Sequence, residues 1–334
     1  MTEALLITLS VVLIFAIVGP GLARRLPPAV ATRLLVPTGV MMAASGVWAL
    51  VTFGFTWVAQ LGPVSRYGDW SATAIRADSP FPMIVPAGCG LLAIGSVTRA
   101  ALLANRRLRF MGAVRRDCAQ HGTAGSLVVL DSEQPDAFAT PGPSGRIVVT
   151  TGLLRALSAA ERRALIAHET AHLVHRHAWW LLATDVAAAA NPLLRPTASA
   201  VEHAVERWAD EDAAHEVTDR RLVARTLART ALLIHNAAPT GLTLATGGDV
   251  PCRVRALLEP PPRPRVLPLT VLLALLVAGS AADATMERQG DRFLDNAVNV
   301  ETVQAQQPVH HDHHGLPSGA HLRHVAHDVQ QFLR

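Results

Sequence analysis

The stretch Ser158-Ala-Ala-Glu161-Arg-Arg-Ala-Leu-Ile-Ala-His168-Glu169-Thr-Ala-His172-Leu-Val-His-Arg-His177 decides how the rest of the chain is interpreted. It opens with a capping box, in which the Ser158 and Glu161 side chains each satisfy a free amide at a helix start. The following residues are mostly Ala, Leu, Arg and Glu, which all favour helix. The sequence therefore predicts a helix that starts at Ser158 and carries the motif H-E-x-x-H.

The spacing within that motif indicates a metal site. Residues four apart share one face of a helix, so the imidazoles of His168 and His172 can bind the same Zn²⁺ ion. Glu169 lies beside the metal, where its carboxylate can accept a proton from a water held there. The motif alone also fits an ordinary helix with surface histidines, and a third ligand would exclude that alternative.

A candidate third ligand lies downstream, in the segment Glu202-His203-Ala-Val-Glu206-Arg-Trp-Ala-Asp210. Catalytic zinc sites use three protein ligands and leave one position for water. Glu206 can face the metal while Asp210, one helical turn later, accepts a hydrogen bond from the free ring N–H of a ligand histidine. The alternative is a solvated acidic helix face, which the upstream motif disfavours. We therefore expect one Zn²⁺ per chain.

Four further histidines lie near these motifs. His203 and His215 are candidates for stabilising the oxyanion of a tetrahedral intermediate, and a surface position is the alternative for both. His175 and His177 follow the predicted zinc helix directly, and we expect both at the surface.

The order of several motifs resembles that of a known family. Ala-Leu-Ile-Ala-His-Glu-Thr-Ala-His (164–172) follows Asp-Ala-Phe-Ala (136–139) and Arg-Ile-Val-Val-Thr-Thr-Gly-Leu-Leu (146–154), and precedes Glu-Arg-Trp-Ala-Asp (206–210). This order, over roughly residues 105–235, resembles the integral-membrane gluzincin peptidases. They include HtpX-like and CAAX-prenyl-protease-like enzymes and the beta-lactam-sensor type.

The resemblance implies a substrate and a way to bind it. In the family, a strand near the zinc helix lines the cleft and pairs with an extended substrate, which gives backbone affinity with little sequence demand. The implied partners are a protein or peptide substrate, such as a membrane protein or a cytoplasmic repressor, and the lipid bilayer.

The composition is that of a membrane protein. Of 334 residues, 50% are hydrophobic and only 17% are charged, and every basic residue is Arg. The net charge of +4 is modest and the arginines flank hydrophobic segments, so we interpret them as topology signals and expect no direct nucleic-acid partner. The three cysteines have no C-x-x-C spacing, which argues against a disulfide framework.

The hydrophobic segments predict the domain organisation. Residues 1–104 form a three-span membrane region, and 266–282 form a last membrane helix. Arginines on one side of these segments place residues 105–262, the catalytic domain, in the cytoplasm of a bacterial cell. The tail, 283–334, is His-rich and extracytoplasmic, and a His-His-Asp-His-His cluster (310–314) makes it a candidate metal site.

Residues 178–195 pose a topological question. His168 and Glu206 must meet at one metal, so a single complete crossing between them is excluded. The apolar run is also short and contains Asp185. We therefore predict a membrane-dipping hairpin or an interfacial helix.

The expected fold class is mainly α, with multi-span membrane helices and an inserted α+β zincin-like catalytic domain. Residues 126–130 and 146–150 are predicted strands, and a simple hairpin edge is the alternative to a strand that pairs with substrate, although one strand can be both. The expected function is that of a membrane-bound zinc-dependent endopeptidase with a glutamate general base. The alternative is a non-enzymatic metal-binding sensor or transport-related membrane protein, which would not explain why a Glu directly follows His168.

Overall fold

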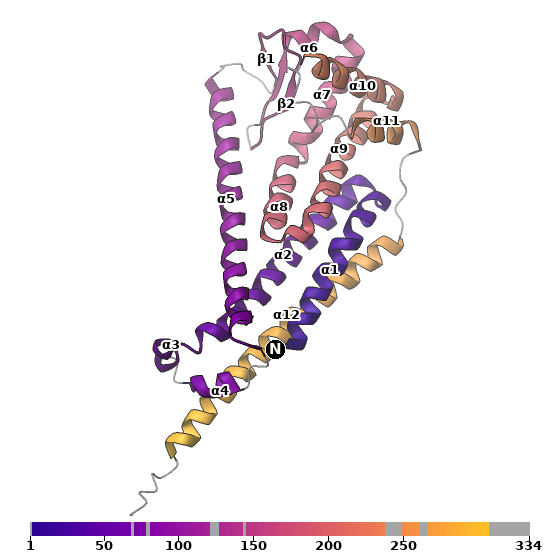
Figure 1. Ribbon diagram of the computed structural model, residues 1–334. Helices are drawn as coiled ribbons and strands as arrows, with labels where there is room; N and C mark the ends of the chain where they lie inside the picture. The colour runs from indigo at the N-terminus through magenta and orange to yellow at the C-terminus, as the bar shows by residue number, and fades with distance from the viewer. Residues whose placement is uncertain are drawn as a thin grey trace, which may run out of the picture.

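The computed structural model describes residues 2–67, 70–77, 81–120, 127–142, 145–237, 249–260 and 266–306. It is an elongated helical molecule with one small sheet (Figure 1). The sheet and α10 lie at one end, and the N-terminus and the last turns of α12 lie towards the other. The elements are α1 (Thr2–Arg25), α2 (Pro28–Val58), α3 (Gly62–Tyr67), α4 (Ala72–Ala77), α5 (Ile84–Gln120), β1 (Leu127–Leu130), β2 (Ala137–Ala139), β3 (Ile147–Thr150), α6 (Thr151–Ala156), α7 (Ala159–Val174), α8 (His177–Ala190), the 3₁₀ turn η1 (Pro192–Leu194), α9 (Arg195–Val217), α10 (Arg220–Ala237), α11 (Val250–Leu258) and α12 (Val266–Gln306).

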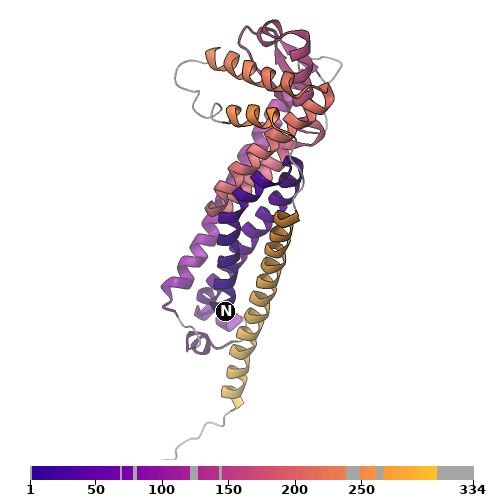
Figure 2. The ribbon, with the colours of Figure 1, turned by 90° about the vertical axis from the view of Figure 1, so that its right-hand side faces the viewer.

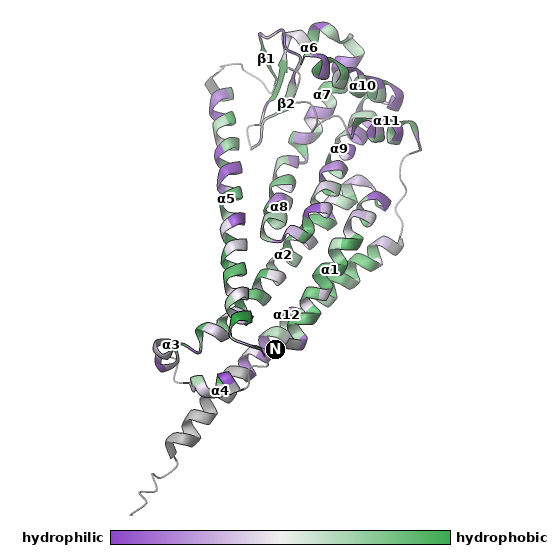
Figure 3. Ribbon diagram, viewed as in Figure 1, coloured by the Kyte–Doolittle hydropathy of each residue, from purple (hydrophilic) through white to green (hydrophobic). Residues whose placement is uncertain are grey.

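Four of the described helices are long and apolar enough to cross a membrane: Glu3–Arg25, Pro28–Val58, Ile84–Cys118 and Pro268–Arg292. Hydrophobic residues dominate α1, α2 and the part of α5 nearest α3, whereas the far part of α5 is more hydrophilic (Figure 3). In the side view, α12 runs along the flank of the bundle (Figure 2). The four apolar segments expected from the sequence are thus four helices, which supports a membrane protein.

Two of these helices cross the domain boundaries expected from the sequence. Helix α5 continues past residue 104 to Gln120, because the arginines, alanines and leucines there all favour helix. Helix α12 continues past residue 282 to Gln306. The histidines of the tail, from residue 310 on, lie outside the described residues.

The segment 178–195 belongs to a helical hairpin. Helix α8 ends at Asn191, whose side-chain oxygen accepts a hydrogen bond from the Leu193 amide at 3.1 Å, and α9 then runs back. The hairpin packs against α1, α2 and α5. Gly46 of α2 leaves room for the Asn191 side chain, and Gly19 of α1 for Thr197, whose hydroxyl would lie 2.7 Å from an added Cβ. The chain thus reverses among the apolar helices and returns Glu206 to the end of the molecule that carries α7.

The largest core cluster joins this hairpin to the apolar helices. Its fully or nearly fully buried members include Phe15, Leu35, Val201, Val205 and Leu272, from α1, α2, α9 and α12. The part of α9 around Val201 and Val205 is therefore packed in the helical bundle, and the rest of the helix extends beyond this core cluster.

The sheet has three described strands, one more than the sequence predicted. Its strand order is β1-β3-β2, with β1 parallel and β2 antiparallel to β3. β1 and β3 are parallel and are therefore not the two arms of one hairpin, whereas β2 pairs antiparallel with β3 and supplies the hairpin edge. β3 is buried along its whole length, whereas β2 is an edge strand that contacts α7. The segment 136–139, which carries β2, therefore lies beside the helix with the H-E-x-x-H motif.

Candidate metal centre

Helix α7 begins as its sequence predicts. The Ser158 hydroxyl accepts a hydrogen bond from the Glu161 amide, and the Glu161 carboxylate accepts one from the Ser158 amide at 2.8 Å. The predicted capping box is confirmed. It fixes where the helix starts, and packing against α9 and β2 then sets which face turns towards them.

His168, His172 and Glu206 converge on one point. The two Nε2 atoms are 3.1 Å apart, and the Glu206 carboxylate oxygens lie 3.7 Å from His168 Nε2 and 3.6 Å from His172 Nε2. In the part of the chain that the structure describes, this is the one group of His, Cys, Asp and Glu side chains that could hold a metal ion.

The donor set fits zinc. Two atoms bound to one tetrahedral Zn²⁺ at its usual bond lengths lie about 3.3 Å apart, close to the separation of the two Nε2 atoms. Burial lowers the pKa of His172 to about 4, which keeps that ring neutral and able to bind a metal. Burial also opposes a charge on His168, but hydrogen bonds with Asp210 and Glu206 raise its pKa to about 10. The same carboxylates would favour a metal cation.

Glu169 and Asp210 lie close to this group, and both line a second cavity together with His168. Glu169 is 9% exposed and also lines the pocket of the three candidate ligands, and burial raises the pKa of its carboxyl. Asp210 Oδ1 lies 3.1 Å from His168 Nδ1, where it can accept the ring N–H and orient the imidazole. The structure thus brings together the five side chains to which the sequence assigns base, ligand and orienting roles. Those roles stay predictions.

Arg253 of α11 completes the group, and sequence reasoning missed it. Its Nε and Nη2 each donate to Asp210 at 2.8 Å, and its Nη1 lies 2.9 Å from Glu206 Oε2. Although burial alone would raise the pKa of Asp210, the hydrogen bonds from Arg253 and His168 hold it below its usual range. The guanidinium therefore ties the third candidate ligand to the residue that orients the first.

His177 was expected at the surface, and that expectation is wrong. Its side chain is 1% exposed, and its Nδ1 lies 3.0 Å from Nδ1 of His172. Arg176 adopts a left-handed conformation (φ 54°), which turns the chain so that α8 begins with His177 beneath His172. The five-residue spacing between the two histidines gave no sign of this contact, because the turn between α7 and α8 creates it.

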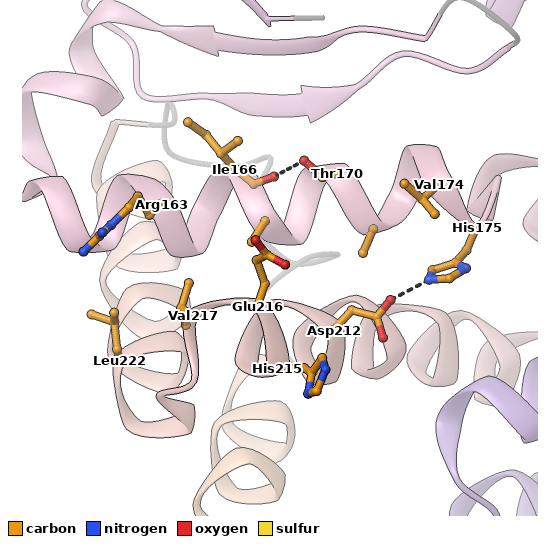
Figure 4. Close-up of a pocket in the computed structure, with 12 residues that line it drawn as sticks. Arg163, Ile166, Thr170, Val174, His175, Asp212, His215, Glu216, Val217 and Leu222 are labelled. Carbon is orange, nitrogen blue, oxygen red and sulfur yellow. Dashed lines mark hydrogen bonds and ion pairs between the residues drawn. The ribbon is translucent and has the colours of Figure 1, made fainter.

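The two candidate oxyanion stabilisers lie elsewhere. His203 pairs through Nδ1 with Asp249 and lines a cavity beside α1. His215 lines a cavity of about 750 Å³ between α7 and α9, where Glu216 also lies and His175 pairs with Asp212 at 2.5 Å (Figure 4). Neither His203 nor His215 is among the described residues that line the pocket with Glu169.

The pocket at the metal centre has a volume of about 360 Å³. Strand β2 forms one wall with Phe138 and Ala139, and α8 contributes Trp179 and Leu181. The candidate metal ligands, the candidate base and a strand edge that no described strand pairs with thus share one cavity.

Known proteins resemble the first half of this site. A model of peptidase family M48 matches residues 109–188, which contain the H-E-x-x-H motif but end before Glu206. A protein named protease HtpX homolog from Thermodesulfovibrio yellowstonii is 51% identical over 53 residues, which are 15% of this chain and 18% of that protein. A protein of the same name from Acidiphilium cryptum is 46% identical over 66 residues, 19% of this chain and 23% of the relative.

The matched segment spans about a fifth of the length of these curated relatives. No solved structure matches the chain. The likeness supports a membrane metallopeptidase family of the M48 type without distinguishing its branches.

Proposed function

We propose that this protein is a membrane-bound, zinc-dependent endopeptidase that hydrolyses peptide bonds of protein substrates. The observation that carries the proposal is the convergence of His168, His172 and Glu206, whose ligand atoms all lie within 4.8 Å of one another, with Glu169 in the same pocket. The M48 match over residues 109–188 supports the same activity.

The three ligands would hold the ion, which supplies Lewis acidity towards a substrate carbonyl and lowers the pKa of a water. Glu169 takes the proton from the attacking water and passes it to the leaving amine. Because burial raises the pKa of this carboxyl, it holds a transferred proton more readily than an exposed glutamate would. Asp210 keeps the His168 ring oriented, and Arg253 holds Asp210 and Glu206 in place.

Substrate binding follows from the walls of the pocket. Among the described strands, β2 pairs with β3 alone, so its other edge can pair with an extended segment of substrate. Backbone pairing makes little demand on sequence, which suits a protein that cleaves several membrane proteins or a cytoplasmic repressor. Arginines at the site end of the apolar helices, such as Arg24, Arg25 and Arg33, favour a cytoplasmic site.

The test is the substitution Glu169→Gln in the purified full-length protein. It removes the base and keeps the ligands, so zinc content should stay at one per chain while cleavage of casein falls by about 10²–10⁴-fold or more. Glu216→Gln is the matched control, because Glu216 lies in the other cavity between α7 and α9.

Equal casein cleavage by wild type and Glu169→Gln would refute the role of Glu169. A wild type that binds zinc and cleaves neither casein nor membrane-protein substrates would favour the metal-sensor alternative.

A further inference from the structure

A groove of about 660 Å³ lies between α5 and the α8–α9 hairpin. It shares Leu181 with the pocket of the metal centre and is otherwise separate from it. One face of each helix lines it, and each face carries charge. The charged residues are Arg99 and Arg107 on α5, Asp185 on α8, and Arg195 and Glu202 on α9.

The charges in this groove are unevenly distributed. Arg107 forms an ion pair with Asp185 at 2.8 Å. Arg99 lies eight residues before Arg107 on α5, roughly 12 Å along the helix. Arg195 lies seven residues before Glu202 on α9, roughly 10 Å along the helix. Among the described residues, neither the Arg99 nor the Arg195 side chain has a hydrogen-bond or ion-pair partner, whereas the Arg195 backbone amide donates to the Pro192 carbonyl. One part of the groove therefore carries two guanidinium groups that no carboxylate neutralises.

These two arginines lie within the apolar part of the bundle. Thr197 lies two residues after Arg195 and packs against Gly19 of α1. Gly19 is five residues before Arg24, in the last turn of that helix. Arg99 is fifteen residues from the start of α5, roughly 22 Å along a helix that can cross a hydrocarbon layer of about 30 Å. From these positions along the helices we expect both arginines in the half of the bilayer nearer the metal centre.

The outer face of α5 beside the groove is apolar and uncovered. Leu91, Leu92, Ile94 and Leu102 are each more than 60% exposed. Of the most apolar window of α5, only 6% is buried. Acyl chains of lipids are the natural neighbours of such a face in a membrane.

We propose that this groove binds an anionic phospholipid, with the headgroup phosphate between Arg99 and Arg195 and the acyl chains along α5. Guanidinium groups form paired, charge-assisted hydrogen bonds with phosphate oxygens, and basic pockets between membrane helices are suited to anionic headgroups. The positive end of the α9 dipole, at Arg195, adds to the attraction. The lipid would brace α5 against the hairpin that carries Glu206. Lipid binding in this groove requires neither a bound metal nor peptidase activity.

The experiment measures lipid binding to the full-length protein in detergent by native mass spectrometry. The probes are dioleoyl phosphatidylglycerol, dioleoyl phosphatidylcholine and inorganic phosphate. The test variant is R99Q/R195Q. The matched control is R106Q/R109Q, which removes the same charge from exposed positions of α5 outside the groove. We expect the wild type and the control to prefer phosphatidylglycerol, and the test variant to lose roughly 10–30-fold of that affinity.

R99K/R195K keeps the charge and should keep most of the preference, which separates lost binding from lost folding. Equal binding of the two lipids by wild type, or equal losses in the test and control variants, would overturn the proposal. Displacement of phosphatidylglycerol by millimolar inorganic phosphate would also overturn it, because the site would then be one for free phosphate.

Discussion

Helices α7 and α11 both contribute side chains to the candidate metal centre, but these contributions depend on different parts of the sequence. Everything that α7 contributes follows from local spacing, because the capping box sets its start and the four-residue repeat places His168 and His172 on one face. The contribution of α11 is one side chain, Arg253, whose partner Asp210 is 43 residues away. Candidate metal ligands on one helix can thus be found from local patterns, whereas Arg253, which contacts Asp210 and Glu206, comes from an element distant in the sequence.

The contacts of α7 and α11 also stabilise the folded protein in different ways. The capping box of α7 is a set of neutral and singly charged hydrogen bonds at a helix end. The contacts of Arg253 are a buried ion-pair network, since Arg253 is 8% and Asp210 2% exposed. Removing one member of a buried pair leaves the other charge uncompensated, so the long-range contact should be the more costly to break.

The largest effect is therefore expected for Arg253→Ala. It leaves the Asp210 carboxylate buried without its main partner, and we expect a loss of about 3–5 kcal/mol in the free energy of unfolding. Zinc affinity should fall as well, because the Glu206 carboxylate loses its contact at 2.9 Å. Chemical denaturation in detergent and zinc analysis measure the two effects.

The control for this prediction is Arg255→Ala, on the same helix and exposed. If Arg253→Ala unfolded at the same denaturant concentration as Arg255→Ala and kept its zinc, the network would have no role. Arg253→Lys should recover only part of the loss, because an ammonium group cannot form the bidentate pair with Asp210.

The sequence predicted the features that depend on short-range spacing. The capping box, the apolar helices and the reversal of the chain between His168 and Glu206 all follow from helix periodicity, composition and one topological condition. The four-residue spacing of Glu206 and Asp210 was enough to suggest how they would face the metal and a ligand ring.

The remaining features depend on tertiary packing. Arg253 and Arg255 look alike in the sequence, and only the docking of α11 against α9 makes one of them buried. The contact of His177 with His172 depends on the left-handed backbone at Arg176. Glycine and asparagine are the usual sequence signals of that conformation, and neither stands at this position. The parallel pairing of β1 with β3 likewise depends on how the chain crosses between them, and short β-branched runs do not encode it.

A smaller effect is expected at His177, which contacts His172 only five residues away in the sequence. Its Nδ1 lies 3.0 Å from Nδ1 of His172, and the other ring nitrogen of His172 is the candidate ligand atom, so we expect this contact to orient the ring. Loss of such a partner typically costs about 10–100-fold in metal affinity. We expect that loss for His177→Ala in a zinc titration against a competing chelator.

His177→Asn should restore part of the affinity, because its amide can replace the ring nitrogen. His235→Ala, at an exposed position of α10, is the control and should bind zinc like wild type. Unchanged zinc affinity in His177→Ala would mean that the buried histidine has a packing role only.

The smallest effect is expected at the capping box, where the contact is local. Ser158→Ala should cost about 1 kcal/mol of stability.

The hydrogen bond from the Ser158 amide, together with the Arg229 guanidinium, holds the pKa of Glu161 below its ordinary value of 4.5. The folded state therefore favours the charged carboxylate, and this contribution is present above pH 4.5 and is lost as the pH falls through the lower, folded-state pKa. The difference in unfolding free energy between wild type and Glu161→Gln should shrink over that acidic window. Glu216→Gln, at an exposed position of α9, controls for the loss of a negative charge. A difference that stayed constant down to the lowest pH at which the protein folds would show that the box contributes through shape alone.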